Sequence, residues 1–527
     1  MLPEFRNEPL TDFTNSENAL RMEEALARVR GQLGEVYPLI IGDRLVSADE
    51  TFASVNPARP EEVVGQFQQG TVEQALEALD AAEAAFPAWS RTPMEHRARV
   101  LLKAAAIMRE RKFELAAWMV YEVSKSWAEA DGDVAELIDF AEYYARLAMK
   151  LAGPQPVHPY PGEENELYYV PLGVGAVIPP WNFPGAITGG MTMAAIVTGN
   201  TVVLKPASTS PAIAYQLVRI LMDEAGVPPG VVNFVTGPGG SIGDALVDSP
   251  KTRFVAFTGS KEIGMRIFER AAKVHPGQKF LKRTILEMGG KDSIVVDETA
   301  DLDSAAEGIV QSAFGFQGQK CSACSRAIIV DAVYDEVLQK VLERARKITV
   351  GDPTDRFNQM GAVIDQKAFQ KIRSYIEMGK REGRLVLGGE TQEGGGYFIP
   401  PTIIADVEPD ARLAQEEVFG PVLALIRAGD FEDAVETFNN TEFGLTGGLY
   451  SRKRERLERA RHELHVGNLY LNRKITGALV GVQPFGGFNM SGTDSKAGGP
   501  DYLLLFSQAK SVTERFGTKP SPVIRPW

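Results

Sequence analysis

The two cysteines of the chain, Cys321 and Cys324, lie three residues apart in the segment FGFQGQKCSACSR. A structural zinc site needs four ligands, so this pair supplies half a set, and the flanking residues lack the pattern of a thioredoxin-type redox pair. The remaining alternatives are two core cysteines or one nucleophilic thiol. We favour the core for Cys324. The Gly-Gln-Lys lead-in and small neighbours of Cys321 indicate an accessible turn into a helix, whose N-terminus would lower the pKa of the thiol.

A carboxylate in a glycine turn is the best candidate to assist such a thiol. None of the five histidines lies in a glycine-rich or strand-end segment, so a cysteine–histidine hydrolase fits poorly. Glu287 stands in LEMGGKD, where two glycines let the backbone approach a ligand and could hold the carboxylate as a general base for water. Taken alone, this motif favours a solvated acid at the end of a strand.

The proline-rich segment PPWNFP (179–184) places Asn182 on a rigid backbone. Its side-chain amide offers two N–H donors, which suits an oxyanion hole. The alternative is an ordinary proline turn with a buried tryptophan, and the segment alone does not decide between them.

Nucleotide-binding signals are present, but G-x-G-x-x-G is not among them. FTGSKEIG (257–264) places Thr258, Gly259 and Ser260 between a predicted strand and a helix, where free N–H groups form an anion site. TVVLKPAS ends a predicted strand at Lys205, whose ammonium could bind ribose hydroxyls. Each signal is common in proteins that bind no nucleotide.

Two blocks of apolar strands and helices must position these residues. TVVLKP (201–206), VVNFVT (231–236) and FVAFTG (254–259) alternate with helical segments, which predicts a parallel sheet covered on both faces, in a doubly wound nucleotide-binding pattern. A second alternating block runs from about Leu286 to Leu471. Before them, an Ala-rich region up to Lys150 predicts several helices, interrupted near residues 130–133.

Composition narrows the class of protein. The chain has 527 residues, 44% of them hydrophobic, and a net charge of −13, which disfavours nucleic acid and anionic membranes as partners. Two cysteines suit a reducing cytoplasm, five histidines leave little room for a metal centre, and no apolar run is long enough to span a membrane. The start, MLPEFRNEPLTDF, lacks a signal pattern.

Together, these segments resemble the aldehyde dehydrogenase superfamily. The motifs fall in that family's order from about residue 37 to residue 515: PWNFP, VVLKPAS, FTGS, LEMGGK, GQKCSA, EEVFGPV, FGLTGGLY and PFGGFNMSG. The resemblance implies an α/β fold with a Rossmann-type cofactor domain, an α/β catalytic domain and a small β oligomerisation arm. The boundaries that we predict are an N-terminal extension (1–36), a cofactor domain (37–151 and 173–285), a catalytic domain (286–490) and oligomerisation or bridging segments (152–172 and 491–527).

The resemblance also implies roles for the candidate residues. Cys321 would attack the aldehyde carbon, Asn182 and the backbone N–H of Cys321 would hold the oxyanion, and Glu287 would activate the water that releases the acid. Lys205 and Glu417 would bind the two riboses of the cofactor. The cofactor-binding residues implied in this way are Trp181, Lys205, Ser208, Gly243, Thr258, Gly259, Ser260, Glu417 and Phe419.

Closer cues, KRTILEMGGKD, GQKCSACSR and KITGALVGVQPFGG, resemble the branch that oxidises L-glutamate γ-semialdehyde, in equilibrium with 1-pyrroline-5-carboxylate, to L-glutamate, the second step of proline catabolism. The substrate-binding residues implied are Phe183, Ser322, Gly477, Ala478 and Phe485. The rival within the family is another semialdehyde dehydrogenase, such as one for succinate semialdehyde. A CoA-acylating relative would lack Glu287, and a binding protein without turnover is disfavoured by the complete catalytic set.

The resemblance implies NAD as the main cofactor, with NADP also acceptable. Many NAD-specific relatives carry a glutamate that pairs with the adenosine ribose, whereas this chain has Lys205-Pro206-Ala207-Ser208, where a 2′-phosphate meets less repulsion. The partners implied are a small-molecule aldehyde and further copies of the chain, as a dimer or an assembly of dimers. The role of Glu136 stays open between gating substrate entry and a plain helix carboxylate, with the latter as the default.

Overall fold

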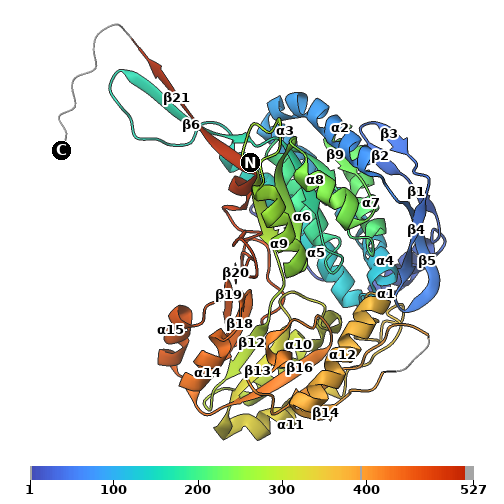
Figure 1. Cartoon of the computed structure of the whole chain (residues 1–527), viewed down its shortest axis with the longest axis vertical. Coiled ribbons are helices and arrows are strands. Elements are labelled where there is room, and N and C mark those ends of the chain that lie inside the picture. The colour runs from blue at the N-terminus through green and yellow to red at the C-terminus, as the bar shows by residue number, and fades with distance from the viewer. Residues whose placement is uncertain (1–2, 392–394, 517–527) are drawn as a thin grey trace.

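The computed structural model describes residues 3–391 and 395–516. Two seven-stranded sheets, each covered by helices, form two halves of the molecule, and a long two-stranded arm projects from one of them (Figure 1). The predicted α/β class, with two alternating blocks, is therefore confirmed.

The first sheet has the order β11-β10-β7-β8-β9-β2-β3, parallel from β11 to β9 and antiparallel at β2 and β3. Its three predicted apolar runs form adjacent or nearby strands, because buried parallel strands read as continuous hydrophobic runs. The strands are β2 (Leu39–Ile41), β3 (Arg44–Val46), β7 (Val174–Ile178), β8 (Thr201–Leu204), β9 (Val232–Phe234), β10 (Thr252–Thr258) and β11 (Arg283–Glu287).

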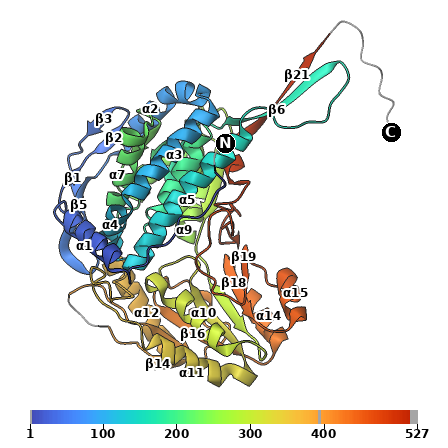
Figure 2. The same ribbon diagram turned by 180° about the vertical axis from the view of Figure 1, so that it is seen from behind.

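Helices cover both faces of this sheet (Figures 1 and 2). They are α1 (Ser16–Arg30), α2 (Val72–Arg91), α3 (Met94–Glu110), α4 (Lys112–Val123), α5 (Trp127–Leu151), α6 (Ala186–Val197), α7 (Pro211–Arg219), α8 (Asp244–Asp248) and α9 (Lys261–Ala272), with π-helical turns at Ile220–Ala225 and Gly239–Gly243. A small sheet of β1 (Val36–Tyr37), β5 (Arg59–Gln68) and β4 (Thr51–Asn56) flanks them.

The predicted interruption near residues 130–133 is wrong, because α5 runs unbroken through Gly132. Tertiary contacts outweigh the low helix propensity of Gly and Asp there. The carboxylate of Asp131 lies 3.0 Å from Lys112 Nζ, and that of Asp133 lies 2.7 Å from Lys125 Nζ in a fully buried pair. Asp131 is therefore bound to α4 and Asp133 to the loop that follows α4, and neither residue breaks the helix.

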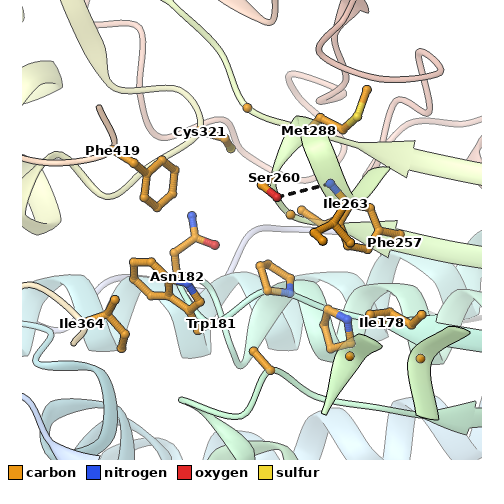
Figure 3. A pocket seen from close by; sticks show the side chains of 18 of the residues that line it. Ile178, Trp181, Asn182, Phe257, Ser260, Ile263, Met288, Cys321, Ile364 and Phe419 are labelled. Carbon is orange, nitrogen blue, oxygen red and sulfur yellow. Dashed lines mark hydrogen bonds between the residues drawn. The ribbon is translucent and has the colours of Figure 1, made fainter. Parts of the chain in front are cut away.

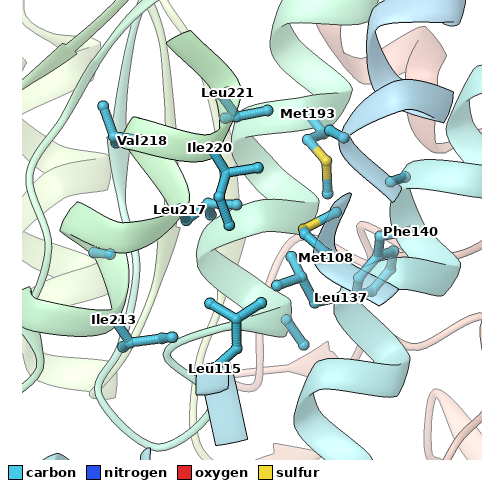
Figure 4. Close-up of a cluster of buried hydrophobic side chains, with 14 of the residues drawn as sticks. Met108, Leu115, Leu137, Phe140, Met193, Ile213, Leu217, Val218, Ile220 and Leu221 are labelled. Carbon is cyan, nitrogen blue, oxygen red and sulfur yellow. The ribbon is translucent and has the colours of Figure 1, made fainter. Parts of the chain in front are cut away.

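The helices pack around an apolar cluster in which Met108, Leu137, Phe140 and Met193 are buried (Figure 4). At Gly189, an added Cβ would lie 2.1 Å from Leu137 Cδ1, so α5 and α6 approach too closely for any side chain. This contact fixes α6, and with it the loop that precedes α6 and carries Asn182.

The second sheet has the order β14-β15-β16-β13-β12-β18-β19, parallel except at β14. Its strands are β12 (Asp292–Val296), β13 (Cys324–Val330), β14 (Arg384–Leu387), β15 (Thr402–Ala405), β16 (Val422–Ala428), β18 (Thr446–Tyr450) and β19 (Asn468–Leu471). The helices of this half are α10 (Leu302–Phe314), α11 (Tyr334–Ala345), α12 (Gln366–Glu382), α13 (Arg412–Gln415), α14 (Phe431–Asn439) and α15 (Arg454–Glu463). A short antiparallel pair is formed by β17 (Phe443–Gly444), which precedes β18, and β20 (Phe488–Asn489), which follows β19.

The arm consists of β6 (Glu163–Pro171) and β21 (Ser507–Arg515), paired antiparallel over nine residues. It extends away from the body in both views (Figures 1 and 2), which agrees with the small β arm that the resemblance implies. The domain boundaries stay a prediction, and residues 1–2 and 517–527 of the predicted terminal segments lie outside the described residues.

Candidate active site

Two cavities, of about 560 and about 310 Å³, have Phe257, Thr258 and Cys321 in common in their linings. The larger one lies at the carboxyl ends of β7, β8 and β10, where open parallel sheets bind ligands. Cys321 therefore stands where the two cavities meet, and Figure 3 shows it on the wall of the larger one.

The loop before Cys321 is held in an unusual backbone conformation. Phe316 and Gln317 have φ values of 48° and 57°, in the left-handed region that bulky residues avoid. The buried Gln317 side chain donates to the carbonyls of Ser124 (3.0 Å) and Ala362 (2.9 Å), which maintains this conformation. The hydrogen bonds of Gln317 thus stabilise the strained backbone and fix the loop that leads to the Cys321 thiol.

The expected turn at Cys321 is present, but the expectation that it leads into a helix is wrong. Cys321 lies in a turn, and the following element is strand β13, which opens at the buried Cys324. No helix N-terminus lowers the pKa of the thiol; instead burial and the nearby carboxylates of Glu287 and Asp292 raise it well above its ordinary value. The predicted assignment of Cys324 to the core agrees with its 1% exposure.

Asn182 is buried in the loop between β7 and α6, and its Nδ2 donates to the Gln319 carbonyl over 3.1 Å. One N–H of the amide is used in this bond, so a second remains for a ligand. Figure 3 shows the amide extending toward the space between Phe419 and Cys321. The carboxylate of Asp133 accepts from the Ala186 N–H (2.5 Å) at the start of α6, which anchors the end of the loop.

Glu287 ends β11 and is 8% exposed, so it is not the solvated strand-end acid that the motif alone favours. Its carboxylate accepts from Ser495 Oγ (2.6 Å) and from the Gly487 N–H (3.1 Å). Burial is the main cause that raises its pKa to about 8, which is the range of a general base near neutral pH. Glu287 and Cys321 both line the smaller cavity.

The larger cavity contains eight of the nine predicted cofactor residues: Trp181, Lys205, Gly243, Thr258, Gly259, Ser260, Glu417 and Phe419. Ser208 is exposed and is not in the lining, where Ala207 stands. The predicted role of Ser208 therefore has no support from the cavity. The other eight residues lie in the cavity lining, as a cofactor-binding role requires, and their roles stay predictions.

Two charged groups of this cavity suit a ribose. Lys205 is buried, and among the described residues its one hydrogen bond goes to the Pro206 carbonyl (3.2 Å), so the ammonium has spare donors. Burial lowers its pKa to about 8. Glu417 accepts from the Gly290 N–H (3.0 Å), and an added Cβ at Gly289 would lie 2.1 Å from its Oε1, which explains the glycine pair.

The helix start that the sequence predicts at Ser260 is present. Ser260 caps α9, with its Oγ accepting from the Ile263 N–H (3.5 Å), a bond that Figure 3 marks. Free N–H groups of this first turn face the same cavity as Lys205, which suits a phosphate group. The residues present thus fit a dinucleotide.

The smaller cavity contains all five predicted substrate residues: Phe183, Ser322, Gly477, Ala478 and Phe485. Glu136 also lies in its lining, and burial followed by Asp133 raises its pKa to about 8. The lining residues that sequence reasoning missed include Glu8, Leu10, Glu129 and Lys320. Only Lys320, next to Cys321, carried a usable signal, because the other three come from distant segments.

Two lysines, Lys125 and Lys320, lie near the Phe183 ring in the wall of the smaller cavity. The Lys125 ammonium lies 4.0 Å from the centroid of the Phe183 ring, and the pKa of this lysine is lowered by burial against the opposing effect of Asp133. Lys320 pairs with Glu129 at 2.7 Å. Each of these two ammonium groups is thus paired with a carboxylate beside the cavity.

Within the described residues, no group of three or more His, Cys, Asp or Glu side chains is placed to hold a metal ion. In the same part of the chain, no helix combines the length and the apolar character that crossing a membrane requires.

The model of the aldehyde dehydrogenase family matches residues 45–512, so the chain belongs to the aldehyde dehydrogenase family. The order of motifs described above and the thiol between two cavities agree with this assignment.

Individual relatives are similar over nearly the whole chain. A protein of Geobacillus sp. (strain WCH70) called 1-pyrroline-5-carboxylate dehydrogenase is 58% identical over 98% of this chain and 100% of its own length. A crystal structure of 1-pyrroline-5-carboxylate dehydrogenase from Thermus with bound NAD is 55% identical, with a TM-score of 0.96, over 98% of this chain and 100% of that one. Proline utilization A from Bdellovibrio bacteriovorus is 46% identical, with a TM-score of 0.95, over 97% of this chain and 53% of its own.

Proposed function

We propose that the protein oxidises L-glutamate γ-semialdehyde, in equilibrium with 1-pyrroline-5-carboxylate, to L-glutamate with NAD, as in the second step of proline catabolism. The observation that carries the proposal is the position of Cys321, between a cavity suited to a dinucleotide and a cavity lined by the predicted substrate residues. The similarity to 1-pyrroline-5-carboxylate dehydrogenases, at 55–58% identity over nearly the full length, supports the same substrate.

The mechanism is covalent catalysis on Cys321. Its thiolate bonds to the aldehyde carbon, and the oxygen of the adduct takes up negative charge that the free N–H of Asn182 and the Cys321 backbone N–H stabilise. NAD, when bound, supplies the acceptor for the hydride that the adduct loses, which leaves a thioester on Cys321. Glu287 then takes a proton from water that attacks the thioester, so that the acid leaves and the thiol is restored.

The raised pKa of the thiol has a consequence for this mechanism. Burial and the nearby carboxylates of Glu287 and Asp292 disfavour the thiolate form of Cys321. The cationic nicotinamide ring would oppose this effect, because a nearby positive charge favours an anion. Binding of NAD before the aldehyde is therefore the order that suits the electrostatics of the site.

The residues that would hold the cofactor are those of the larger cavity. Lys205 and Glu417 would bind the ribose hydroxyls, the N–H groups of the α9 start would bind phosphate, and Phe419 would lie beside the nicotinamide ribose. Acceptance of NADP stays a prediction that rests on Ser208, which stands where many NAD-specific relatives carry the glutamate that pairs with the adenosine ribose.

The α-carboxylate of the substrate would be bound by Ser322 and by the N–H groups of Gly477 and Ala478, with Phe183 and Phe485 against the aliphatic chain. Gly477 has φ +74°, so the turn that presents these N–H groups requires a glycine. Local N–H dipoles suffice to bind an anion even when the net charge is negative.

The test is NADH formation by the purified protein with L-glutamate γ-semialdehyde and with succinate semialdehyde, which lacks the α-amino group and has its carboxylate one carbon nearer. We expect kcat/KM at least about 100-fold higher with the former, because a clamp built for one carboxylate position leaves its N–H groups unpaired with the other. Equal turnover of the two aldehydes would contradict the proposed substrate.

The remaining parts of the proposal concern assembly and location. In the arm, β21 is mostly exposed, and among the described strands it pairs with β6 alone, so we propose that its outer edge pairs with another copy of the chain. Sedimentation of the protein with and without residues 507–515 would test this. A cytoplasmic location fits the two free cysteines and the use of NAD.

A further inference from the structure

Residues 3–13, which precede α1, form a segment that we call the N-terminal strap. It lies along α5 (Figure 2) without regular secondary structure, and named side chains hold it in place. Thr11 bonds to Asp131 through both its N–H (2.8 Å) and its Oγ1 (2.5 Å), and the Lys112 ammonium donates to the Pro9 carbonyl (2.9 Å). The strap is thus an ordered part of the structure.

Asn7 connects the strap to both α5 and the loop of residues 477–483. Its Nδ2 donates to Asp139 Oδ2 (2.8 Å) and to the Val480 carbonyl (2.9 Å). An amide nitrogen carries two protons, so both bonds form at once. The second oxygen of Asp139 accepts from the Glu8 N–H (2.6 Å), which fixes the strap on the other side of Asn7.

An aromatic contact supports the same loop. Phe5 of the strap packs edge-on against Tyr143 of α5, with ring centroids 5.1 Å apart. Gly481 lies against this pair, because an added Cβ there would be 3.0 Å from Tyr143 and 3.2 Å from Phe5. The loop residues next to Gly477 and Ala478 therefore rest on the strap.

The strap also reaches the cavity itself. Glu8 and Leu10 line the smaller cavity together with Ala478, Val480 and Phe485. The Glu8 carboxylate forms an ion pair with Arg109 at 2.8 Å, so its negative charge is balanced beside the cavity.

We propose that Asn7 is a positioning residue for the substrate and that the N-terminal strap forms one wall of the substrate cavity. Asn7 holds the Val480 carbonyl and thereby sets the position of the Gly477 and Ala478 N–H groups. This inference rests on the proposed role of those N–H groups in binding the α-carboxylate.

The test compares Asn7→Ala with Asn15→Ala in the full-length protein. Asn15 caps α1 by accepting from the N–H groups of Glu17 and Asn18, so its variant controls for a general loss of stability. For Asn7→Ala we expect a rise of about 10-fold in KM for L-glutamate γ-semialdehyde, the effect of about 1.4 kcal/mol. The KM for NAD and kcat/KM for propanal, which has no carboxylate, stay unchanged. Asn15→Ala changes none of these.

Two further variants separate positioning from folding. Asn7→Gln keeps the two donors and should recover part of the affinity, whereas Asn7→Asp, which lacks them and faces Asp139, should not. Amide hydrogen exchange should become faster in residues 477–483 of Asn7→Ala and stay the same in β8. An unchanged semialdehyde KM, or an equal rise in KM for propanal, would overturn the inference.

Ser322→Ala distinguishes failure of the inference from failure of the carboxylate assignment. If Ser322→Ala raises the semialdehyde KM and Asn7→Ala does not, the strap has no positioning role and the carboxylate site stands. If neither variant changes KM, the carboxylate is bound elsewhere and both statements fail.

Discussion

The two cavities beside Cys321 are built in different ways. The larger one takes most of its polar groups from strand ends and helix starts of the first sheet and adds Glu417 from the second half, and the groups come with short contiguous motifs such as FTGS, VVLKPAS and EEVFGPV. The smaller one combines the N-terminal strap, α5, the Cys321 turn and the 477–485 loop. Local sequence thus specifies the polar groups of the larger cavity, while the wall of the smaller cavity depends on how remote segments pack.

This difference predicts that substitutions in the two cavities change the kinetics in different ways. Changes in the larger cavity should alter the use of NAD with every aldehyde, and changes in the smaller one should depend on the aldehyde. Changes at Cys321, which belongs to both, should remove all turnover.

The largest effect is expected for Cys321→Ala, which removes the nucleophile. NADH formation should fall by about 10⁴-fold or more with any aldehyde, because no other group in the site can form the covalent adduct. NAD affinity, measured by calorimetry, should stay within a factor of two or so. Loss of NAD binding would show that the variant disturbs the larger cavity and not just the chemistry.

Glu287→Gln should slow steady turnover by about 10²- to 10⁴-fold while a first burst of NADH remains, because the base acts after hydride loss. The native pKa of about 8 means that Glu287 is protonated below that pH, so steady turnover of the wild type should rise as the pH increases through 8. Rapid-mixing absorbance measures the burst, and steady-state rates give the pH profile. Full steady turnover in the variant would refute the assigned role.

Asn182→Ala should lower kcat by about 10²- to 10³-fold, because one oxyanion donor is lost. The burst itself should slow in this variant, unlike that of Glu287→Gln. Asn182→Ser, with a shorter donor, is the matched control and should keep an intermediate rate. An undiminished burst would exclude Asn182 from the oxyanion site.

The smallest effect is expected for Lys205→Met, which keeps the aliphatic stem and removes the ribose donor. The KM for NAD should rise by about 10-fold, consistent with loss of a charge-assisted hydrogen bond of about 1.5 kcal/mol. The KM for L-glutamate γ-semialdehyde should not change. If the semialdehyde KM rises equally, the two cavities are not functionally separate.

Much of the fold and of the larger cavity could be predicted from the sequence. Fully apolar runs identified β8, β9 and β10, and the turn after β10 marked the start of α9 at Ser260. These features are local, so a short window of sequence contains the physical information.

The features that were missed depend on tertiary contacts. The Asp131 and Asp133 pairs keep α5 continuous through Gly132, and hydrogen bonds of Gln317 hold the turn in which Cys321 lies outside any helix. Glu8 and Leu10 reach the smaller cavity from a polar segment with no motif. No periodicity in the sequence indicates such contacts.

The central claim is that Cys321 carries the acyl group between oxidation and hydrolysis. Acid quenching of Glu287→Gln in the presence of NAD and L-glutamate γ-semialdehyde, followed by peptide mass spectrometry, tests it most directly. The account predicts one glutamyl adduct, on the peptide that contains Cys321 and on that sulfur, and none on Cys324. An adduct on another residue, or a burst of NADH without any adduct, would contradict it.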